Sequence, residues 1–182
     1  MRSPLFRNLI ACEDEYGPAV AVVHLPMSRQ LLVAGRGQGC WLRASSDPLR
    51  EQGRRLRVSV RTGLIGAGVQ GHNIGGWPSD LLRSLHSRVL LLGDFGGSVG
   101  VAMGTLDALV IAGPAMGYED RATLPLLIGE AGGRVTDLGG APVLTGDGSV
   151  LASNGLIHDA LLELTRDSGR YRDDLGQILS AQ

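Results

Sequence analysis

The fold is decided by residues 89–112, which read VLLLGDFGGSVGVAMGTLDALVIA. Val89–Leu92 is a short, wholly apolar run, typical of a buried strand in an α/β sheet. A glycine-rich turn follows, then the small residues of Gly97–Met103, which we expect to form a helix, and then a second apolar run over Leu106–Ala112. This order of strand, turn, helix and strand predicts the alternating half of an α/β protein.

The segments on either side of this stretch extend the pattern. A helix is expected to open at Pro78, and another is expected over Asp120–Ala131, where two glycines end it. Val150–Ala152 is predicted to be a strand, Asn154 an N-cap, and Ile157–Leu164 a closing amphipathic helix. Residues 77–166 therefore make the α/β half, and residues 168–182 a loosely held tail.

Residues 1–70 are expected to form an antiparallel meander. Turn sequences separate four short apolar segments, namely Leu5–Cys12, Ala19–Leu25, Gln30–Gly35 and Gly39–Arg43. A further strand over 55–60 alternates with period two and places Leu56, Val58 and Val60 on one face. A chain of 182 residues with this organisation fits a single domain.

Composition excludes several classes of protein. All 17 basic residues are arginines, so lysine-dependent chemistry such as Schiff-base catalysis or a Walker A loop is excluded. A net charge of -1 argues against a nucleic-acid binder. Cys12 and Cys40 indicate neither a zinc site nor a disulfide framework, and both are expected in the core. No apolar run has the length of a membrane span and no signal peptide is seen, so we expect a cytoplasmic protein.

The turn after the first apolar strand carries the first candidate site. Backbone amides around Gly93 and Ser98 could receive a phosphate at the start of the helix, while Asp94 could meet a cationic group or a metal. A glycine-rich turn between a strand and a helix also has a purely structural explanation. Both explanations stay open for these residues.

Two further candidates lie in loops. Glu119 and Asp120 begin a helix after a loop, where a carboxylate can cap the helix or hold a hard cation such as magnesium. His72 lies in the glycine-rich stretch 71–76, which we expect to be a mobile loop, and is a candidate acid or base. The other histidines, His158 among them, are expected to have packing or surface roles.

A family resemblance adds to these expectations. The run 130–137, EAGGRVTD, preceded ten positions earlier by Asp120, resembles the C-terminal signature of the inositol monophosphatase superfamily, as does AGRGQGCW at 34–41 its hairpin. Gly93-Asp94-Phe95 and 153–158, SNGLIH, are most similar to the histidinol-phosphate phosphatase branch. The resemblance implies an α-β-α-β-α sandwich, magnesium-dependent hydrolysis of a phosphate ester, Asp120 as a metal ligand and Asp94 facing the substrate.

The sequence also departs from the family pattern. No Asp-x-x-Asp-Gly-Thr motif occurs, Gly113 stands where the family has an acid, and Glu119 where it has an aromatic residue. We therefore expect an N-terminally truncated form of the sandwich that self-associates to hide an exposed apolar face. Three functions stay open: a phosphatase, a protein that binds a small molecule without hydrolysis, and an enzyme using Asp94, Glu119, Asp120 or His72 for metal-independent acid/base chemistry.

Overall fold

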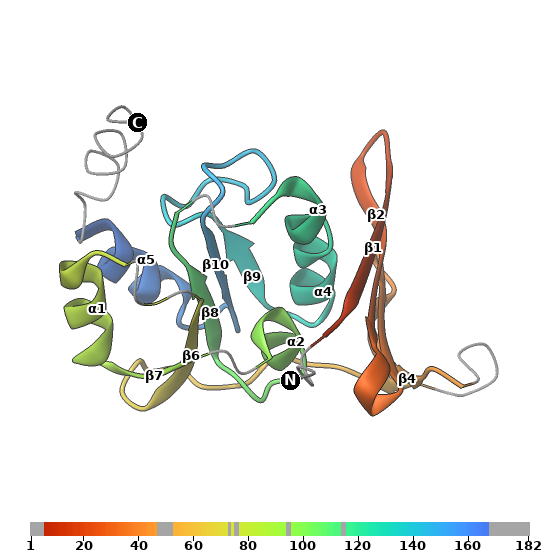
Figure 1. Cartoon of the computed structure of the whole chain (residues 1–182), viewed down its shortest axis with the longest axis horizontal. Helices are drawn as coiled ribbons and strands as arrows, with labels where there is room; N and C mark the ends of the chain where they lie inside the picture. The colour runs from red at the N-terminus through yellow and green to blue at the C-terminus, as the bar shows by residue number, and fades with distance from the viewer. Residues whose placement is uncertain are drawn as a thin grey trace.

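The computed structural model describes residues 6–46, 53–72, 74, 77–93, 96–113 and 116–167. Within them, two five-stranded sheets alternate with two layers of helices (Figure 1). The layers run from helices α1 (Ser79–His86) and α5 (His158–Asp167), through the second sheet and the helices α2 to α4, to the first sheet. The predicted layered α/β fold is confirmed, and the described residues form four layers of the expected sandwich.

The first sheet is the predicted meander. Its strands are β1 (Asn8–Asp14), β2 (Gly17–Leu25), β3 (Gln30–Gly35), β4 (Gly39–Ala44) and the two-residue β5 (Arg54–Arg55). They pair in chain order, each antiparallel to the next. Short turns, and the 3-10 turn η1 (Pro26–Ser28), enforce this order because they can join only neighbouring antiparallel strands.

The prediction of a strand over 55–60 is wrong beyond Arg55, where β5 ends. Leu56 is buried as predicted, but Val60 is 86% exposed, so the alternating residues do not share one covered face. The backbone amide of Leu56 donates to Cys40, whereas that of Val58 donates to Ala131 at the end of helix α4. The chain leaves the first sheet here and crosses to the second.

The second sheet mixes parallel and antiparallel strands in the order β7-β6-β8-β10-β9. Its strands are β6 (Ala67–His72), β7 (Val89–Leu92), β8 (Ala108–Ile111), β9 (Arg134–Thr136) and β10 (Val150–Ser153). β6 runs parallel to β7 and β8, and β10 runs antiparallel to β8 and β9.

Strand β6 corrects two expectations. The meander does not extend to residue 70, and the glycine-rich stretch from Gly71 does not begin a loop, because Ala67–His72 joins the second sheet. Gly71 reflects close packing. A Cβ atom at Gly71 would lie 2.6 Å from Ile74 and 2.8 Å from Trp77, so the strand passes beneath side chains that a larger residue would displace.

The helices follow the predictions with one break. α2 (Gly97–Ala102) and α1 lie where expected, but the helix predicted over 120–131 is divided into α3 (Tyr118–Arg121) and α4 (Leu124–Glu130). Pro125 lies in the first turn of α4, where its missing N–H is tolerated, and a proline there favours a new helix start over a continuous helix. Among the described residues, no helix has the length and apolar character needed to cross a membrane.

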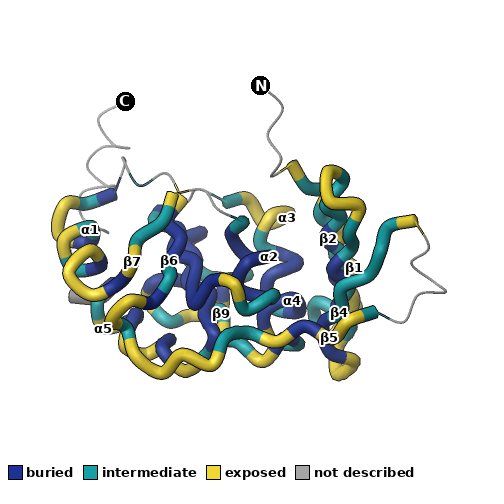
Figure 2. Tube along the Cα trace, turned by 90° about the horizontal axis from the view of Figure 1, so that it is seen from below, coloured by how far each residue is buried: buried dark blue, intermediate teal, exposed yellow. Residues whose placement is uncertain are grey.

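Two clusters of buried side chains hold the layers together. One lies between the two sheets and includes side chains of helices α2 and α4, and the other lies between the second sheet and helices α1 and α5. Figure 2 shows this burial concentrated in α2, α4 and the neighbouring strands. Cys40 lies in the first cluster, and burial raises the pKa of its thiol to about 12. Cys12, expected in the core, is exposed.

Candidate functional site

A pocket opens where the parallel strands β6 and β8 end. It has a volume of about 220 Å³, and its polar residues are Arg7, Gln70, His72 and Ser98. The two glycines Gly96 and Gly97 and the apolar residues Leu109, Ile111, Met116 and Leu124 complete the lining. The pocket therefore offers both polar and apolar groups to a small ligand.

The topology brings these residues together. Parallel pairing places His72 beside Ile111, the last residues of β6 and β8, and the first turn of α2 follows the neighbouring strand β7. Arg7 reaches the pocket from the start of the first sheet, next to β1. The carboxyl ends of parallel strands are where α/β sheets most often bind ligands.

Two hydrogen bonds fix the glycine turn that forms one side of the pocket. The backbone amide of Gly97 donates to Gln70 Oε1 at 2.5 Å, and Arg7 Nη1 donates to the carbonyl of Gly96 at 3.3 Å. Gly96 and Gly97 have φ angles of 103° and 54°, a region that favours glycine. The turn thereby keeps a guanidinium at the pocket, where it can hold an anionic group.

The sequence-predicted site residues divide into two groups. His72 and Ser98 line the pocket together, with His72 at the end of a strand and not in the expected loop. Glu119 and Asp120 lie exposed on α3 and are not among the residues that line it. Gly93 is also exposed and outside the lining, and Asp94 lies outside the described residues.

Arg7 and Gln70 are pocket residues that sequence reasoning missed. Gln70 is only 4% exposed in a strand whose neighbours Ala67 and Val69 are fully buried. A polar residue near the end of an otherwise apolar strand can indicate a binding site. Gln70 could have been found in this way only if 67–72 had been predicted to be a strand. Arg7 carried no local signal, because its place at the pocket depends on how the two sheets meet.

The described residues do not fit the magnesium site that the resemblance implies. Within 6–46, 53–72, 74, 77–93, 96–113 and 116–167, no three His, Cys, Asp or Glu side chains gather into a group that could hold a metal ion. Glu130, in the signature run, accepts hydrogen bonds from the amides of Gly37 (2.6 Å) and Gly39 (2.7 Å) in the β3–β4 turn. Magnesium needs several oxygen ligands, and exposed Asp120 alone is not enough.

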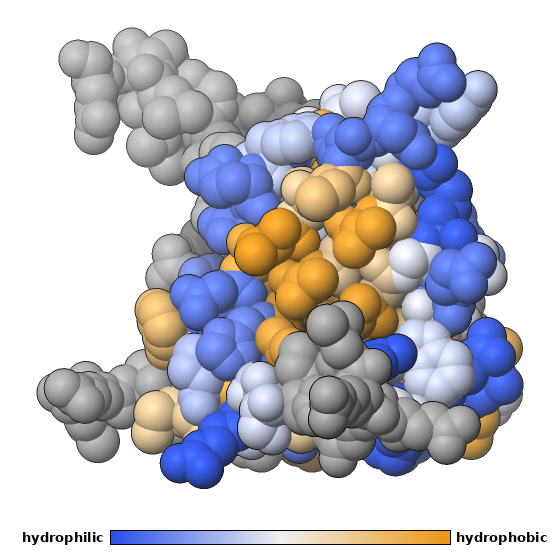
Figure 3. Space-filling view, turned by 90° about the vertical axis from the view of Figure 1, so that its right-hand side faces the viewer, coloured by the Kyte–Doolittle hydropathy of each residue, from blue (hydrophilic) through white to orange (hydrophobic). Residues whose placement is uncertain are grey.

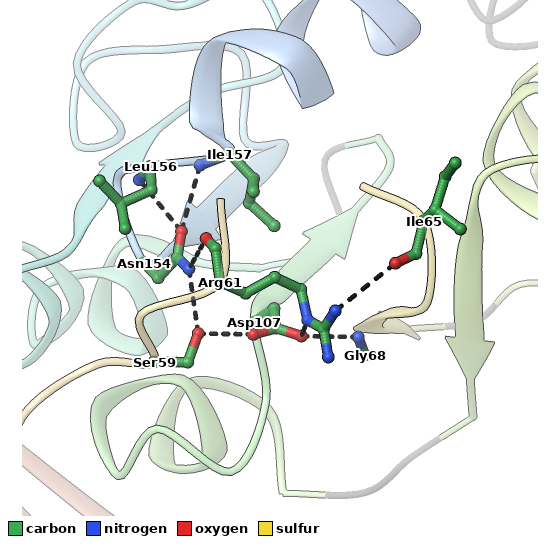
Figure 4. A network of polar contacts seen from close by, with 8 residues as sticks. All are labelled: Ser59, Arg61, Ile65, Gly68, Asp107, Asn154, Leu156 and Ile157. Carbon is green, nitrogen blue, oxygen red and sulfur yellow. Dashed lines mark hydrogen bonds and ion pairs between the residues drawn. The ribbon is translucent and has the colours of Figure 1, made fainter. Parts of the chain in front are cut away.

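A second polar cluster lies at the opposite end of β8 (Figure 4). The carboxylate of Asp107 accepts hydrogen bonds from Ser59 Oγ at 2.5 Å, Arg61 Nε at 3.0 Å and the amide of Gly68 at 2.8 Å. Asn154 Nδ2 donates to Ser59 Oγ and to the carbonyl of Arg61. These bonds tie the crossing segment 56–66 to strands β6, β8 and β10.

Asn154, predicted as the N-cap of the closing helix, caps the turn that precedes α5 and lies four residues before the first residue of that helix. Its Oδ1 atom accepts hydrogen bonds from the amides of Leu156 and Ile157, just before α5. The amide of Asn154 donates to the carbonyl of Asp107, which joins the cap to the Asp107 cluster.

His158 is fully buried beside this cluster, which confirms a packing role. Thr136 Oγ1 bonds His158 Nε2 at 3.0 Å, and Ser153 Oγ bonds Nδ1 at 2.9 Å. Thr136 donates its hydroxyl proton to the carbonyl of Asp137, so it can only accept from the ring, and Nε2 carries the ring proton. Burial, reinforced by nearby Arg134, lowers the pKa of His158 to about 4.

Comparison with known proteins agrees with this architecture. The family described as the inositol monophosphatase family matches residues 4–170. A histidinol-phosphatase from Mycobacterium tuberculosis is 36% identical over 166 residues, which are 87% of this chain and 61% of that protein. An inositol-1-monophosphatase from Mesorhizobium japonicum is 31% identical over 176 residues, 90% of this chain and again 61% of the relative.

A solved structure shows the same fold. The extragenic suppressor protein suhB from Bartonella henselae superposes with a TM-score of 0.76 at 25% identity, covering 90% of this chain and 62% of that one. The chain thus spans about three fifths of the length of these relatives.

Proposed function

The chain belongs to the inositol monophosphatase family, and from this premise we propose that it acts on a small phosphate monoester held in the pocket between β6, β8 and α2. The observation that carries the proposal is the position of Arg7, His72 and Ser98 around one cavity at the carboxyl ends of parallel strands. The names of the histidinol-phosphatase and inositol-1-monophosphatase relatives support this class of substrate.

The proposed roles follow from the chemistry of each side chain. The Arg7 guanidinium holds an anionic oxygen of the ester, since guanidinium donors match phosphate oxygens in pairs. Ser98, 5% exposed, offers a hydroxyl to the same ligand, and the imidazole of His72 can carry a proton to or from an ester oxygen. Gln70 keeps the glycine turn in place through its bond to Gly97.

Hydrolysis of a phosphate monoester in this family implies magnesium, which activates water and offsets phosphoryl charge. Because the described carboxylates do not gather into a metal site, we assign the described residues no metal-dependent step. The pocket side chains Arg7, His72 and Ser98 can bind a phosphate ester without a metal, which favours a second candidate, a protein that binds the ester without cleaving it.

Paired measurements of binding and turnover separate the candidates. The purified chain is titrated with histidinol phosphate and with inositol 1-phosphate by calorimetry, and release of inorganic phosphate is followed with and without magnesium. We expect Arg7→Gln to weaken binding about tenfold, as expected for the loss of one charge-assisted hydrogen-bonding group. Arg88→Gln, the same change at an exposed arginine outside the pocket, should leave binding unchanged.

Each result identifies one function. Magnesium-dependent phosphate release that is lost in Asp120→Asn identifies a phosphatase, and binding without release identifies the second candidate. Release that needs His72 but no magnesium identifies metal-independent acid/base chemistry. If neither ester binds at millimolar concentration, the proposal is wrong.

A further inference from the structure

A second cavity lies at one end of the first sheet and shares no residue with the pocket described above. It has a volume of about 390 Å³, and its polar lining residues are Ser28, Arg29, Gln30, Arg43 and Arg54. We call it the basic hollow, because the described residues that line it include three arginines and no acidic side chain. A chain with a net charge of -1 thus gathers positive charge at one place.

Strand pairing brings these residues together. Gln30, the first residue of β3, pairs with Ala44, the last residue of β4. Arg54, at the start of β5, pairs with Leu42, and Arg29 directly precedes β3. Figure 3 views the first sheet from the side away from helices α2 and α4 and shows hydrophilic side chains around an apolar centre. The charged side chains of this sheet are therefore gathered at its margins.

The arginines at the two ends of the sheet differ in what they bind. At the end away from the basic hollow, Arg36 pairs with Asp14 at 2.9 Å and donates to two backbone carbonyls. By contrast, no described residue forms an ion pair or a hydrogen bond with the side chain of Arg29 or Arg54. Both residues are exposed. Their guanidinium groups therefore have N–H donors available for a ligand.

The backbone of Arg29 has an unfavourable conformation. Its φ angle is 52°, and it is the one non-glycine residue with a positive φ among the described residues. Its amide donates to the carbonyl of Pro26 at 3.3 Å, and its carbonyl accepts from the amide of Ser45 at 2.9 Å. A glycine makes such a turn with less strain, so the turn itself does not require an arginine. Strained residues cluster at binding sites, which favours a role for the guanidinium.

We propose that the basic hollow binds a phosphorylated anion with two or more negative charges, and that Arg29 and Arg54 hold it. A guanidinium group matches the oxygens of a phosphoryl group with two parallel N–H donors. Two guanidinium groups with available donors can each hold one phosphoryl group of a diphosphate. Free diphosphate and a nucleoside diphosphate share this chemistry, and they differ in whether a nucleoside occupies the rest of the cavity.

Calorimetric titrations with pyrophosphate, inorganic phosphate and ADP test the site. The whole chain carrying Arg7→Gln is the parent protein, so that binding at the other pocket contributes little and the result does not depend on the proposed function. We expect pyrophosphate to bind with a dissociation constant below about 1 mM, and more tightly than phosphate. Tighter binding of ADP than of pyrophosphate identifies a nucleotide as the ligand, and weaker binding identifies free diphosphate.

Substitutions locate the binding. Arg29→Gln and Arg54→Gln should each weaken pyrophosphate binding about tenfold, as expected for the loss of charge-assisted hydrogen bonds. Arg57→Gln is the matched control, because it removes the same charge from an exposed arginine that lines a different cavity. Circular dichroism establishes that each variant is folded.

Arg29→Gly separates binding from the turn. This variant should bind pyrophosphate about as weakly as Arg29→Gln, yet unfold at the same temperature as the parent chain or at a higher one, because glycine relieves the strained backbone. The proposal is wrong if pyrophosphate does not bind at up to about 10 mM, or if folded Arg29→Gln and Arg54→Gln bind it as the parent does. An equal loss in Arg57→Gln would also overturn it, since the attraction would then come from overall positive charge.

Discussion

The two ends of strand β8 carry polar side chains for different purposes. At its start, Asp107 is 8% exposed and its carboxylate accepts three hydrogen bonds from the protein itself. At its end, Ile111 adjoins a cavity lined by Arg7, His72 and Ser98. A polar group whose bonding capacity is used within the fold stabilises it, whereas polar groups around a cavity can exchange solvent for a ligand.

The largest expected effect on stability comes from breaking the hydrogen-bond cluster around Asp107. Asp107→Ala leaves Ser59, Arg61 and the amide of Gly68 without their shared acceptor. We expect the free energy of unfolding to fall by about 3 kcal/mol, the lower end for a broken buried pair because Arg61 is partly exposed. Urea denaturation measures it. Asp120→Ala, at an exposed carboxylate, should change stability by no more than about 0.5 kcal/mol. Equal effects in the two variants would contradict a stabilising role for the hydrogen bonds that Asp107 accepts.

The next largest effect is a loss of stability at acid pH that is caused by His158, which lies beside the Asp107 cluster. Its pKa is about 4 in the folded protein against 6.5 for an unperturbed histidine. The unfolded chain therefore takes up a proton first as the pH falls, and stability declines from about pH 6.5 down to about pH 4. The full difference is on the order of 3 kcal/mol. Thermal unfolding across this range should show the slope, and His158→Gln should flatten it. An unchanged slope in that variant would assign the acid sensitivity elsewhere.

The smallest effect on stability is expected in the pocket. His72 is exposed, so His72→Gln should alter the free energy of unfolding by less than about 0.5 kcal/mol. The same variant should reduce turnover, if any is measured, because a glutamine amide cannot carry the proton. Denaturation and phosphate-release assays on one preparation give both values. A large loss of stability would place His72 with the structural residues.

Local patterns predicted much of the fold correctly. The four long strands of the meander and the small-residue helix α2 were predicted within a few residues, and Asn154 was expected as a cap and caps the turn before α5. Each depends on interactions between residues close in sequence, such as a turn, an alternation or a side chain reaching two or three residues ahead.

Elements that depend on distant partners were missed. Strand β6 resembled a loop because Gly71 makes room for Ile74 and Trp77. The segment after Arg55 resembled a strand, although the amide of Val58 donates to Ala131 and not to a neighbouring strand. The residues of the candidate site show the same difference between local and distant signals. Ser98 and His72 were named from their local motifs, whereas Arg7 and Gln70 are recognised only when the two sheets are in place.

The sequence by itself determined the family, the layered α/β class and the exclusion of lysine chemistry, because motifs, periodicity and composition can be read along the chain. The tertiary structure alone decided which polar residues share a cavity and which are used inside the fold. It joined Arg7 to His72 across 65 positions and placed Asp120 outside the pocket. The physical reason is that a binding site depends on distances between side chains, and sheet pairing and layer packing set those distances.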